Sequence, residues 1–375
     1  MTGTSLSVPT TAGIRFPLLV FVVWRLVQGV VVAAFGGTLR ESTYAFDGGW
    51  YLSLLRQGYV PPVDGYDQMS NLAFFPGLIW VTDAVQFVVR NETAATLLAA
   101  NGLALGAFVA VWGAARAWVG EENARRVTLL LALFPTSYYL WMYFTEGLLV
   151  LATAAAAWAG RRERHTVATA FLVLASTARL VGVAAGPALA LARIVRLRRV
   201  DSVSVRYVAG SAVGLGAVMV RQAVEAGDAL GFLRAGQAWG RQFAGPWTPL
   251  YDAARAVGSA LPAIEDDVVL DAAGVVLVGA LVVLLWRGLR RGAEPGRSVW
   301  PLEAAVLGTA LWVIPVCSKL IGGQLRYMLA CWPALLVVAD AWPRLPRAAR
   351  AAGVAGTVAV GVLLLHHLAH GIYTG

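Results

Sequence analysis

Apolar residues gather along this chain into long runs that short polar segments separate. Most of these runs are roughly 17–22 residues long, which is the length an α-helix needs to cross a hydrocarbon core of about 30 Å. The first run follows residues 1–15 and is too long for the apolar core of a signal peptide, so we expect a retained first helix. The pattern predicts an all-α polytopic membrane protein, with one domain over residues 1–375.

The runs predict about eleven transmembrane helices. We expect them at residues 16–35, 93–115, 126–142, 146–160, 166–178, 180–196, 205–222, 268–286, 300–316, 327–342 and 350–368. A further short apolar segment, 74–89, carries Asp83 and either crosses the bilayer or lies at its outer surface. If it lies at the surface, about 19 cations fall on the cytoplasmic side, as the positive-inside rule requires. This interpretation places the N-terminus in the cytoplasm and the C-terminus outside.

Two outer connections are then unusually long, at residues 36–92 and 223–267, and loops of this size tend to carry function. Both contain aromatic and amphipathic stretches that suit interfacial helices in the headgroup layer. Most carboxylates fall on the same outer side, among them Asp47, Asp64, Asp67, Glu225, Asp228, Glu265, Asp266 and Asp267.

Composition supports a membrane protein, because 58% of the 375 residues are hydrophobic and only 14% are charged. The mean hydropathy is +0.67. A net charge of +9 would also suit a nucleic-acid-binding protein, but the basic residues are scattered between apolar runs. Orientation in the membrane and attraction to anionic lipid explain them better, so we expect no nucleic-acid partner. The cations are arginines apart from Lys319, which, with the Ala/Gly/Val bias, indicates a high-GC, actinobacterial-like genome and the bacterial inner (plasma) membrane.

The first outer loop contains the stretch AFDGGWYLSLLRQGY, in which an acid is followed by two glycines and two aromatics. Gly48 and Gly49 favour a tight turn after Asp47, and Trp50 and Tyr51 are typical interface anchors. Asp47 is either a capping residue on a surface helix or a general base where a lipid-linked substrate meets water. The residues alone leave both possibilities open.

Two more charged residues interrupt apolar sequence. Glu146 begins an apolar segment on the outer side, where the helix dipole would favour a carboxylate by about 0.3–1 kcal/mol. Arg179 divides a long apolar stretch, and a cation at bilayer depth costs on the order of 2.5–3.5 kcal/mol. We therefore expect Arg179 to face a partner or a polar cavity.

The later outer segments combine cations with amides and aromatics. The second long loop offers Arg234, Gln237, Trp239 and Arg241, which suit either a sugar or phosphate ligand or an amphipathic helix at the headgroups. A segment near the end places Lys319, Gln324, Arg326 and Tyr327 at the outer mouth of a helix. The positive-inside rule does not explain basic residues on the outer side, so anion binding is a plausible role for them.

Other chemical signatures are absent from the sequence. It contains no glycine-rich phosphate loop, no HExxH and no Cys/His set with metal-ligand spacing. Its two cysteines, Cys317 and Cys331, exclude a disulfide framework. The acids at 265–267 are more typical of a solvated helix start than of a cation site. We expect neither a metal nor a cofactor.

Six segments in order over about residues 45–340 resemble the PIG-V-type mannosyltransferases, bacterial relatives of the second mannosyltransferase of GPI-anchor assembly in the GT-C superfamily. The segments are DGGWYLSLLRQGY, AFFPGL, LFPTSYYLWMYFTEGLLVLATAAAAWAGRRER, ASTARLVGVAAGPAL, GDALGFLRAGQAWGR and LRYMLACWPALLVVAD. The resemblance implies a multispanning GT-C-like fold whose first outer loop carries the catalytic acid, here Asp47. It also implies that Glu146 and Arg179 line the cavity and that Arg326 and Tyr327 form the late outer motif.

Such enzymes move a sugar, usually mannose, from a polyprenyl-phosphate donor with inversion, onto a lipid, glycan or protein hydroxyl. The leaving phosphate needs no proton, so one base and several guanidiniums suffice, without the carboxylate pair of a glycosidase. The Arg-Pro step of the family is Arg179-Leu180 here, and Lys319 matches no family role. Two other classes remain: a transporter or flippase for a lipid-linked sugar, and a membrane scaffold without activity. A transporter often has repeated halves, which this sequence lacks, and a scaffold leaves the outer arginines unexplained.

Overall fold

The computed structural model describes residues 11–62, 65–251, 254, 266–290, 300–319 and 322–372. Within these ranges the regular elements are helices, apart from one isolated antiparallel bridge between Phe243 and Ser318. Four of the acids expected on the outer side are not covered: Asp64 and Glu265 lie outside the described residues, as do the side chains of Asp266 and Asp267.

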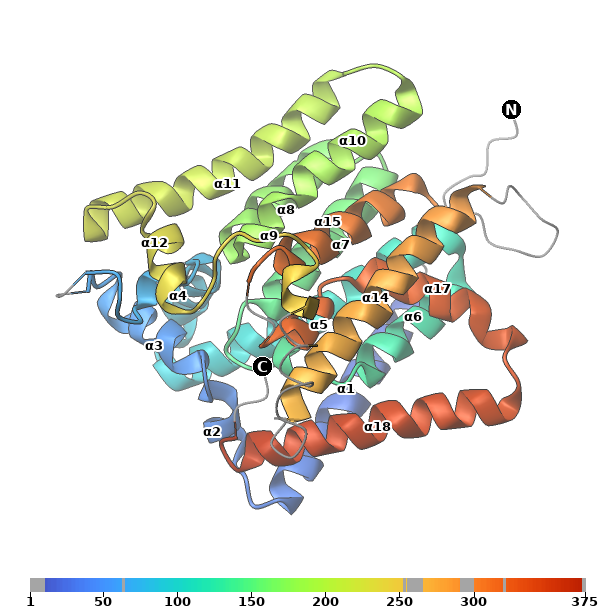
Figure 1. Ribbon diagram of the computed structural model, residues 1–375, viewed down its shortest axis with the longest axis horizontal. Helices are drawn as coiled ribbons and strands as arrows, with labels where there is room; N and C mark the ends of the chain where they lie inside the picture. The colour runs from blue at the N-terminus through green and yellow to red at the C-terminus, as the bar shows by residue number, and fades with distance from the viewer. Residues whose placement is uncertain are drawn as a thin grey trace.

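The helices form one bundle, with α11 and α18 at opposite edges of it in Figure 1. The α-helices are α1 Thr11–Ala34, α2 Leu39–Tyr44, α3 Gly48–Gln57, α4 Gly77–Val89, α5 Glu92–Val119, α6 Glu121–Leu133, α7 Glu146–Arg161, α8 His165–Ala178, α9 Leu180–Val183, α10 Ala185–Leu197, α11 Ser202–Ala226, α12 Gly231–Ala238, α14 Asp266–Arg290, α15 Leu302–Val316, α16 Gln324–Met328, α17 Leu335–Ala341 and α18 Arg347–Ala369. The 3₁₀ turns are η1 Asn71–Ala73, η2 Ser137–Leu140, η3 Trp332–Ala334 and η4 Trp342–Arg344.

Six helical stretches of the described chain are long and apolar enough to cross a membrane. They are Gly13–Ala34, Glu92–Val119, Leu180–Leu197, Ser202–Ala226, Val268–Leu289 and Arg347–Ala369. Three shorter apolar helices, Gly77–Val89, His165–Ala178 and Leu302–Val316, accompany them. The protein is therefore an all-α, multispanning membrane protein, whereas the number of eleven spans stays a prediction.

Two of the expected helices are broken at a proline, and the one expected over 180–196 is interrupted by a turn at Ala184. The helix expected over 126–142 ends at Leu133, because Pro135 follows and holds Phe134 in an extended conformation with ψ 128°. The helix expected over 327–342 is replaced by α16, η3 and α17, with Pro333 in the second of these. Proline lacks the N–H that a continuous helix needs, so both helices give way to short turns.

The segment whose placement was ambiguous forms α4, which packs on α5 and α8. A Cβ on Gly77 would lie 2.5 Å from Oγ1 of Thr177, so only glycine permits this contact with the end of α8. The other face of α4 is open, with Phe87 83% exposed. At 13 residues, about 20 Å long, α4 is shorter than a perpendicular membrane span, and its placement at the outer surface stays a prediction.

Small residues bring the central helices close together. Helix α7 lies between α5 and α8, and its run of alanines is buried. A Cβ on Gly113 of α5 would lie 2.5 Å from the Trp158 ring of α7. Glycine at this position therefore lets the two helices pack closely, as small residues do in membrane bundles. This packing fixes the start of α7, and with it Glu146.

Candidate functional site: a buried cluster of acids and guanidiniums

A strained turn places Asp47 at the start of α3. The chain turns between α2 and α3, and Phe46 adopts the left-handed region with φ 54°. Such a conformation in a bulky residue is uncommon and persists only where the surroundings impose it. The sequence favours a turn at Gly48 and Gly49, but the positive φ falls on Phe46. Gly48 instead allows a close approach, because a Cβ added at this position would lie 3.2 Å from the Thr43 carbonyl oxygen.

Asp47 holds the N-cap position of α3, but its side chain makes no capping hydrogen bond. The residue is only 5% exposed, and Oδ2 accepts a hydrogen bond of 3.0 Å from Nη1 of Arg326. The capping interpretation of Asp47 is therefore wrong, because the carboxylate turns inward to a cation 279 positions away in the chain.

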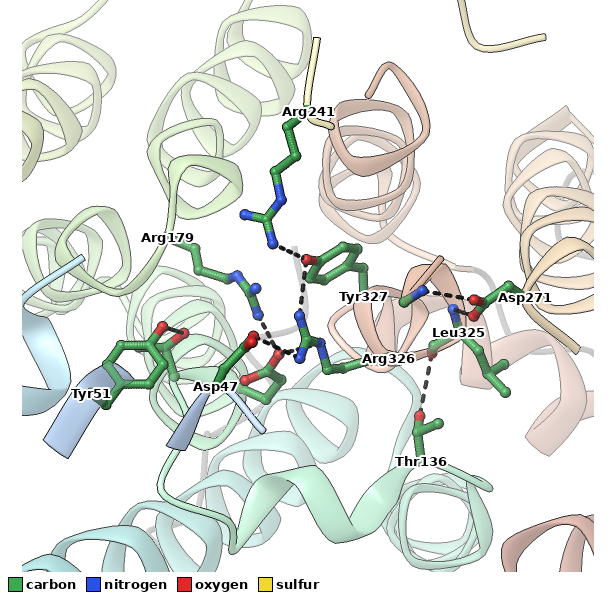
Figure 2. Close-up of polar contacts among 12 residues, drawn as sticks. Asp47, Tyr51, Thr136, Arg179, Arg241, Asp271, Leu325, Arg326 and Tyr327 are labelled. Atoms are coloured by element: carbon green, nitrogen blue, oxygen red, sulfur yellow. Dashed lines mark hydrogen bonds and ion pairs between the residues drawn. The ribbon is translucent and has the colours of Figure 1, made fainter. Parts of the chain in front are cut away.

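Arg326 is the centre of the cluster and is 1% exposed. Its Nε lies 3.2 Å from Oε1 of Glu146, which also accepts a hydrogen bond from Nη1 of Arg179. Figure 2 shows Asp47, Arg179 and Arg326 converging from separate elements. Glu146 begins α7, and Arg179 occupies the extended break between α8 and α9, with φ −163° and ψ 158°. The expectation that Arg179 faces a partner is confirmed.

Aromatic rings enclose the buried guanidinium. The Cζ of Arg326 lies 5.3 Å, 5.4 Å and 4.9 Å from the ring centroids of Tyr139, Phe144 and Tyr327. Arg179 stands over the Tyr327 ring as well, at 4.5 Å. Cations are attracted to ring faces at such distances, so the rings stabilise charge where water is excluded.

Tyr327 joins a third cation to the cluster. Its hydroxyl oxygen accepts hydrogen bonds from Nη2 of Arg326, at 3.0 Å, and from Nη2 of Arg241, at 2.7 Å (Figure 2). Arg241 follows α12 in the second long loop. The backbone next to it pairs with the end of α15, because the amide of Ala244 donates to the carbonyl of Cys317 at 2.7 Å. The loop is thus held across the cluster.

A buried acid that is not among the candidates from the sequence fixes the backbone just before Arg326. Asp271, in α14, accepts hydrogen bonds from the amides of Gly323 and Leu325, at 2.7 Å and 2.6 Å. The carbonyl of Leu325 in turn accepts a hydrogen bond from Thr136 at 3.3 Å (Figure 2). Asp271 lies within a candidate span, where burying an acid costs free energy unless it has partners. A charge within an apolar stretch indicated a partner for Arg179, and the same holds for Asp271.

Several polar atoms of the cluster are not used within the described part of the chain. Oε2 of Glu146 is buried there without a hydrogen-bond partner. Asp47 makes its hydrogen bond through Oδ2, so among the same residues its Oδ1 has no hydrogen bond. Arg179 and Arg241 each donate one side-chain hydrogen bond, through Nη1 and Nη2 respectively. Two acids and two cations therefore retain capacity for a ligand.

The expected aromatic anchors lie beside the cluster. Tyr51 is buried, and its hydroxyl lies 3.0 Å from Oγ1 of Thr145, next to Glu146. Trp50 stacks on Phe74 with centroids 6.2 Å apart, and Trp239 meets both rings edge-on, at 5.6 Å and 5.4 Å. These contacts attach α3 and the second long loop to each other.

The remaining candidates point elsewhere. Arg234 bonds to Asp228 and holds the pKa of that carboxyl below its usual range through the hydrogen bond. The side chains of Gln237 and Lys319 are exposed. Gln324 is buried and donates to the Pro315 carbonyl at 2.9 Å, so it supports the turn before α16. Within the described residues, no group of three His, Cys, Asp or Glu side chains is arranged to hold a metal ion.

Comparison with known proteins identifies the fold. The sequence matches no protein-family model, and no curated protein matches it significantly. Among solved structures, ArnT from Cupriavidus metallidurans bound to undecaprenyl phosphate is similar, with a TM-score of 0.52 and 19% identity over 87% of this chain and 60% of that one. The oligosaccharyltransferase of Archaeoglobus fulgidus in its apo form gives 0.55 and 11%, over 96% of this chain and 56% of the other. This chain thus covers a little more than half of either protein and shares their GT-C-like fold.

Proposed function

We propose that this protein is an inverting glycosyltransferase of the membrane, which moves mannose from polyprenyl-phosphate mannose to a hydroxyl acceptor on the extracytoplasmic side. The observation that carries the proposal is the buried cluster of Asp47, Glu146, Arg179 and Arg326. A fold shared with ArnT, which was solved with undecaprenyl phosphate, supports a polyprenyl-phosphate donor. The PIG-V-type resemblance of the sequence supports mannose.

In this proposal, Asp47 is the general base. The acceptor hydroxyl loses its proton to Oδ1 of Asp47, the oxygen that Arg326 does not bond. The acceptor oxygen then bonds to the anomeric carbon from the face opposite the phosphate, and the bond between that carbon and the phosphate oxygen breaks. Base catalysis of this kind contributes about 10²–10⁴ in rate. The proton stays on Asp47 until it is released to solvent.

The donor phosphate binds Arg179 and Arg241 in this mechanism, because these two cations retain free N–H groups. Guanidiniums stabilise the negative charge that grows on the phosphate as the bond breaks, so no acid has to protonate it. Arg326 has its side-chain nitrogens directed to Asp47, Glu146 and Tyr327, and we assign it a positioning role. The free Oε2 of Glu146 is suited to accept a hydroxyl of the donor sugar.

We further propose that the eleven predicted segments cross the membrane, two of them as helices broken at a proline, with a cytoplasmic N-terminus and the cluster at the outer border of the bilayer. The positive-inside distribution of arginines supports this orientation. A lipid, a glycan or a protein hydroxyl is compatible with the mechanism as acceptor.

The test is transfer by the purified protein in vesicles, with labelled polyprenyl-phosphate mannose and a cell-envelope extract from a deletion strain as the source of acceptor. We expect a labelled product that forms without movement of the donor across the bilayer. Movement of intact donor without a mannosylated product would instead indicate the flippase alternative.

A further inference from the structure

A groove of about 590 Å³ runs along the outside of the bundle between α1, α6 and α18. Its walls include Val23 of α1, Leu130 of α6, and Val358 and Leu365 of α18. Val23 and Val358 are 52% and 45% exposed, and both belong to candidate membrane spans. The groove therefore opens toward the hydrocarbon of the bilayer.

The polar side chains along this groove are satisfied within the protein, including Arg126, which is bonded to Glu122 and Asn123. Gln28 donates to Ser137 at 3.1 Å and accepts from the indole of Trp141 at 2.5 Å. Ser137 also accepts from the indole of Trp24 at 3.0 Å, and Thr357 donates to the Gly353 carbonyl at 3.1 Å. Hydrogen-bonded polar groups need no polar ligand, so the body of the groove suits a hydrocarbon chain.

One end of the groove is cationic. A second hollow shares Trp342, Val354 and Val358 with it and adds Arg347 and Arg350, at the start of α18. Within the described chain neither of these two arginines forms an ion pair, whereas neighbouring Arg344 is paired with Asp340 at 2.9 Å. Two free guanidiniums beside an apolar groove match an anionic head with a hydrocarbon tail.

The cationic end lies far from the acid–guanidinium cluster. Helix α18 runs from Arg347 to Ala369, and Ala369 packs on Gly37, just before α2 and the turn to Asp47. The 23 residues of α18 put Arg347 roughly 33 Å from that end. In the proposed orientation Arg347 and Arg350 face the cytoplasm, so the anionic head belongs to the inner leaflet and not to the outer-facing sugar donor.

We propose that this groove binds an anionic diacyl phospholipid of the cytoplasmic leaflet. Its phosphate contacts Arg347 and Arg350, Trp342 lies at the headgroup level, and one acyl chain follows α18 toward Leu365, a length of about 22 Å. The positive-inside rule explains cations at this end, but it explains neither their position at the mouth of a groove nor the groove itself. The proposal depends on the orientation and not on sugar transfer.

The experiment is native mass spectrometry of the full chain released from nanodiscs, titrated with phosphatidylglycerol or phosphatidylcholine. We expect a first phosphatidylglycerol to bind at least tenfold more tightly than phosphatidylcholine. The double variant Arg347→Gln/Arg350→Gln should lose about 30-fold in affinity for phosphatidylglycerol. Each basic residue near anionic lipid contributes about fivefold in affinity, and the variant removes two. Arg198→Gln/Arg199→Gln is the matched control, because both arginines are exposed and lie outside the groove, and it should bind as the wild type does.

A second pair of variants tests the groove separately from the charge. Val358→Trp fills the groove from a partly exposed position and should abolish the tight site, whereas Leu363→Trp, on a similarly exposed position outside the lining, should not. Equal binding of the two lipids, or a Val358→Trp variant that binds like Leu363→Trp, would overturn the proposal. So would displacement of phosphatidylglycerol by an equimolar polyprenyl phosphate, or a dimer that Val358→Trp dissociates without any change in lipid binding.

Discussion

Replacing Asp47 by asparagine removes the proposed base while keeping its shape. Asparagine cannot take the acceptor proton, so the rate of transfer should fall by about 10²–10⁴. The structural cost is limited, because the asparagine carbonyl oxygen still accepts from Nη1 of Arg326, and Glu146 stays 3.2 Å from Nε. Loss of a whole partner from a buried pair costs about 3–5 kcal/mol, so we expect less here, about 1–3 kcal/mol of unfolding free energy.

The assay is single-turnover transfer from labelled polyprenyl-phosphate mannose by protein in nanodiscs, alongside donor binding and thermal unfolding. Asp228→Asn is the matched control: it neutralises an acid that is also paired with an arginine on the outer loops, but away from the cluster. Its rate should be unchanged. The affinity of Asp47→Asn for the anionic donor should be equal or higher, since a negative charge is removed. A folded Asp47→Asn protein that turns over within threefold of the wild-type rate would refute the base assignment.

Three further predictions concern the groups around Asp47. Arg179→Ala should weaken donor binding about tenfold or more, through loss of a charge-assisted hydrogen bond to phosphate, and an unchanged donor Kd in a binding assay would mean that Arg179 acts only on Glu146. Arg241→Gln should weaken donor binding to a similar degree, while Arg234→Gln, the same change in the same loop, should leave it within twofold; equal effects in a side-by-side titration would argue against phosphate binding by Arg241. Asp271→Asn replaces one acceptor oxygen by an amide, so it should cost about 1–3 kcal/mol in thermal unfolding and lower kcat without raising the KM for donor; a normal kcat would show that Asp271 does not position the late motif.

The helices were largely predictable from the sequence, because the bilayer sets the length of an apolar run. The two largest departures come from proline. Pro135 and Pro333 stand within segments that are apolar enough to span, and hydropathy alone does not register the missing N–H. Both breaks lie beside the cluster: η2 is followed by Phe144 and Glu146, and η3 follows Arg326.

The candidate site was predictable where a charge stands in apolar surroundings, as at Glu146 and Arg179. The same argument covers Asp271, which was overlooked. Which charged residues pair with each other was not predictable, because the contact between Asp47 and Arg326 depends on how the whole helix bundle packs. The sequence also offered no means to separate Arg234 from Arg241, since the second points to Tyr327 only through the backbone pairing of its loop with the end of α15.

The surplus of cations in the cluster has a kinetic consequence. Two carboxylates, Asp47 and Glu146, face three guanidiniums, so the resting pocket carries one net positive charge. In the proposed reaction the donor arrives as a phosphodiester with a single charge, and the spent carrier remains as a monoester with nearly two. If this reaction takes place, we expect the pocket to hold the spent carrier more tightly than the donor, so release of the carrier should be the slow step of each cycle. Arg241 belongs to a loop and makes a single hydrogen bond to Tyr327. Movement of Arg241 away from the pocket would remove its excess positive charge, so this movement would control how fast the carrier is released.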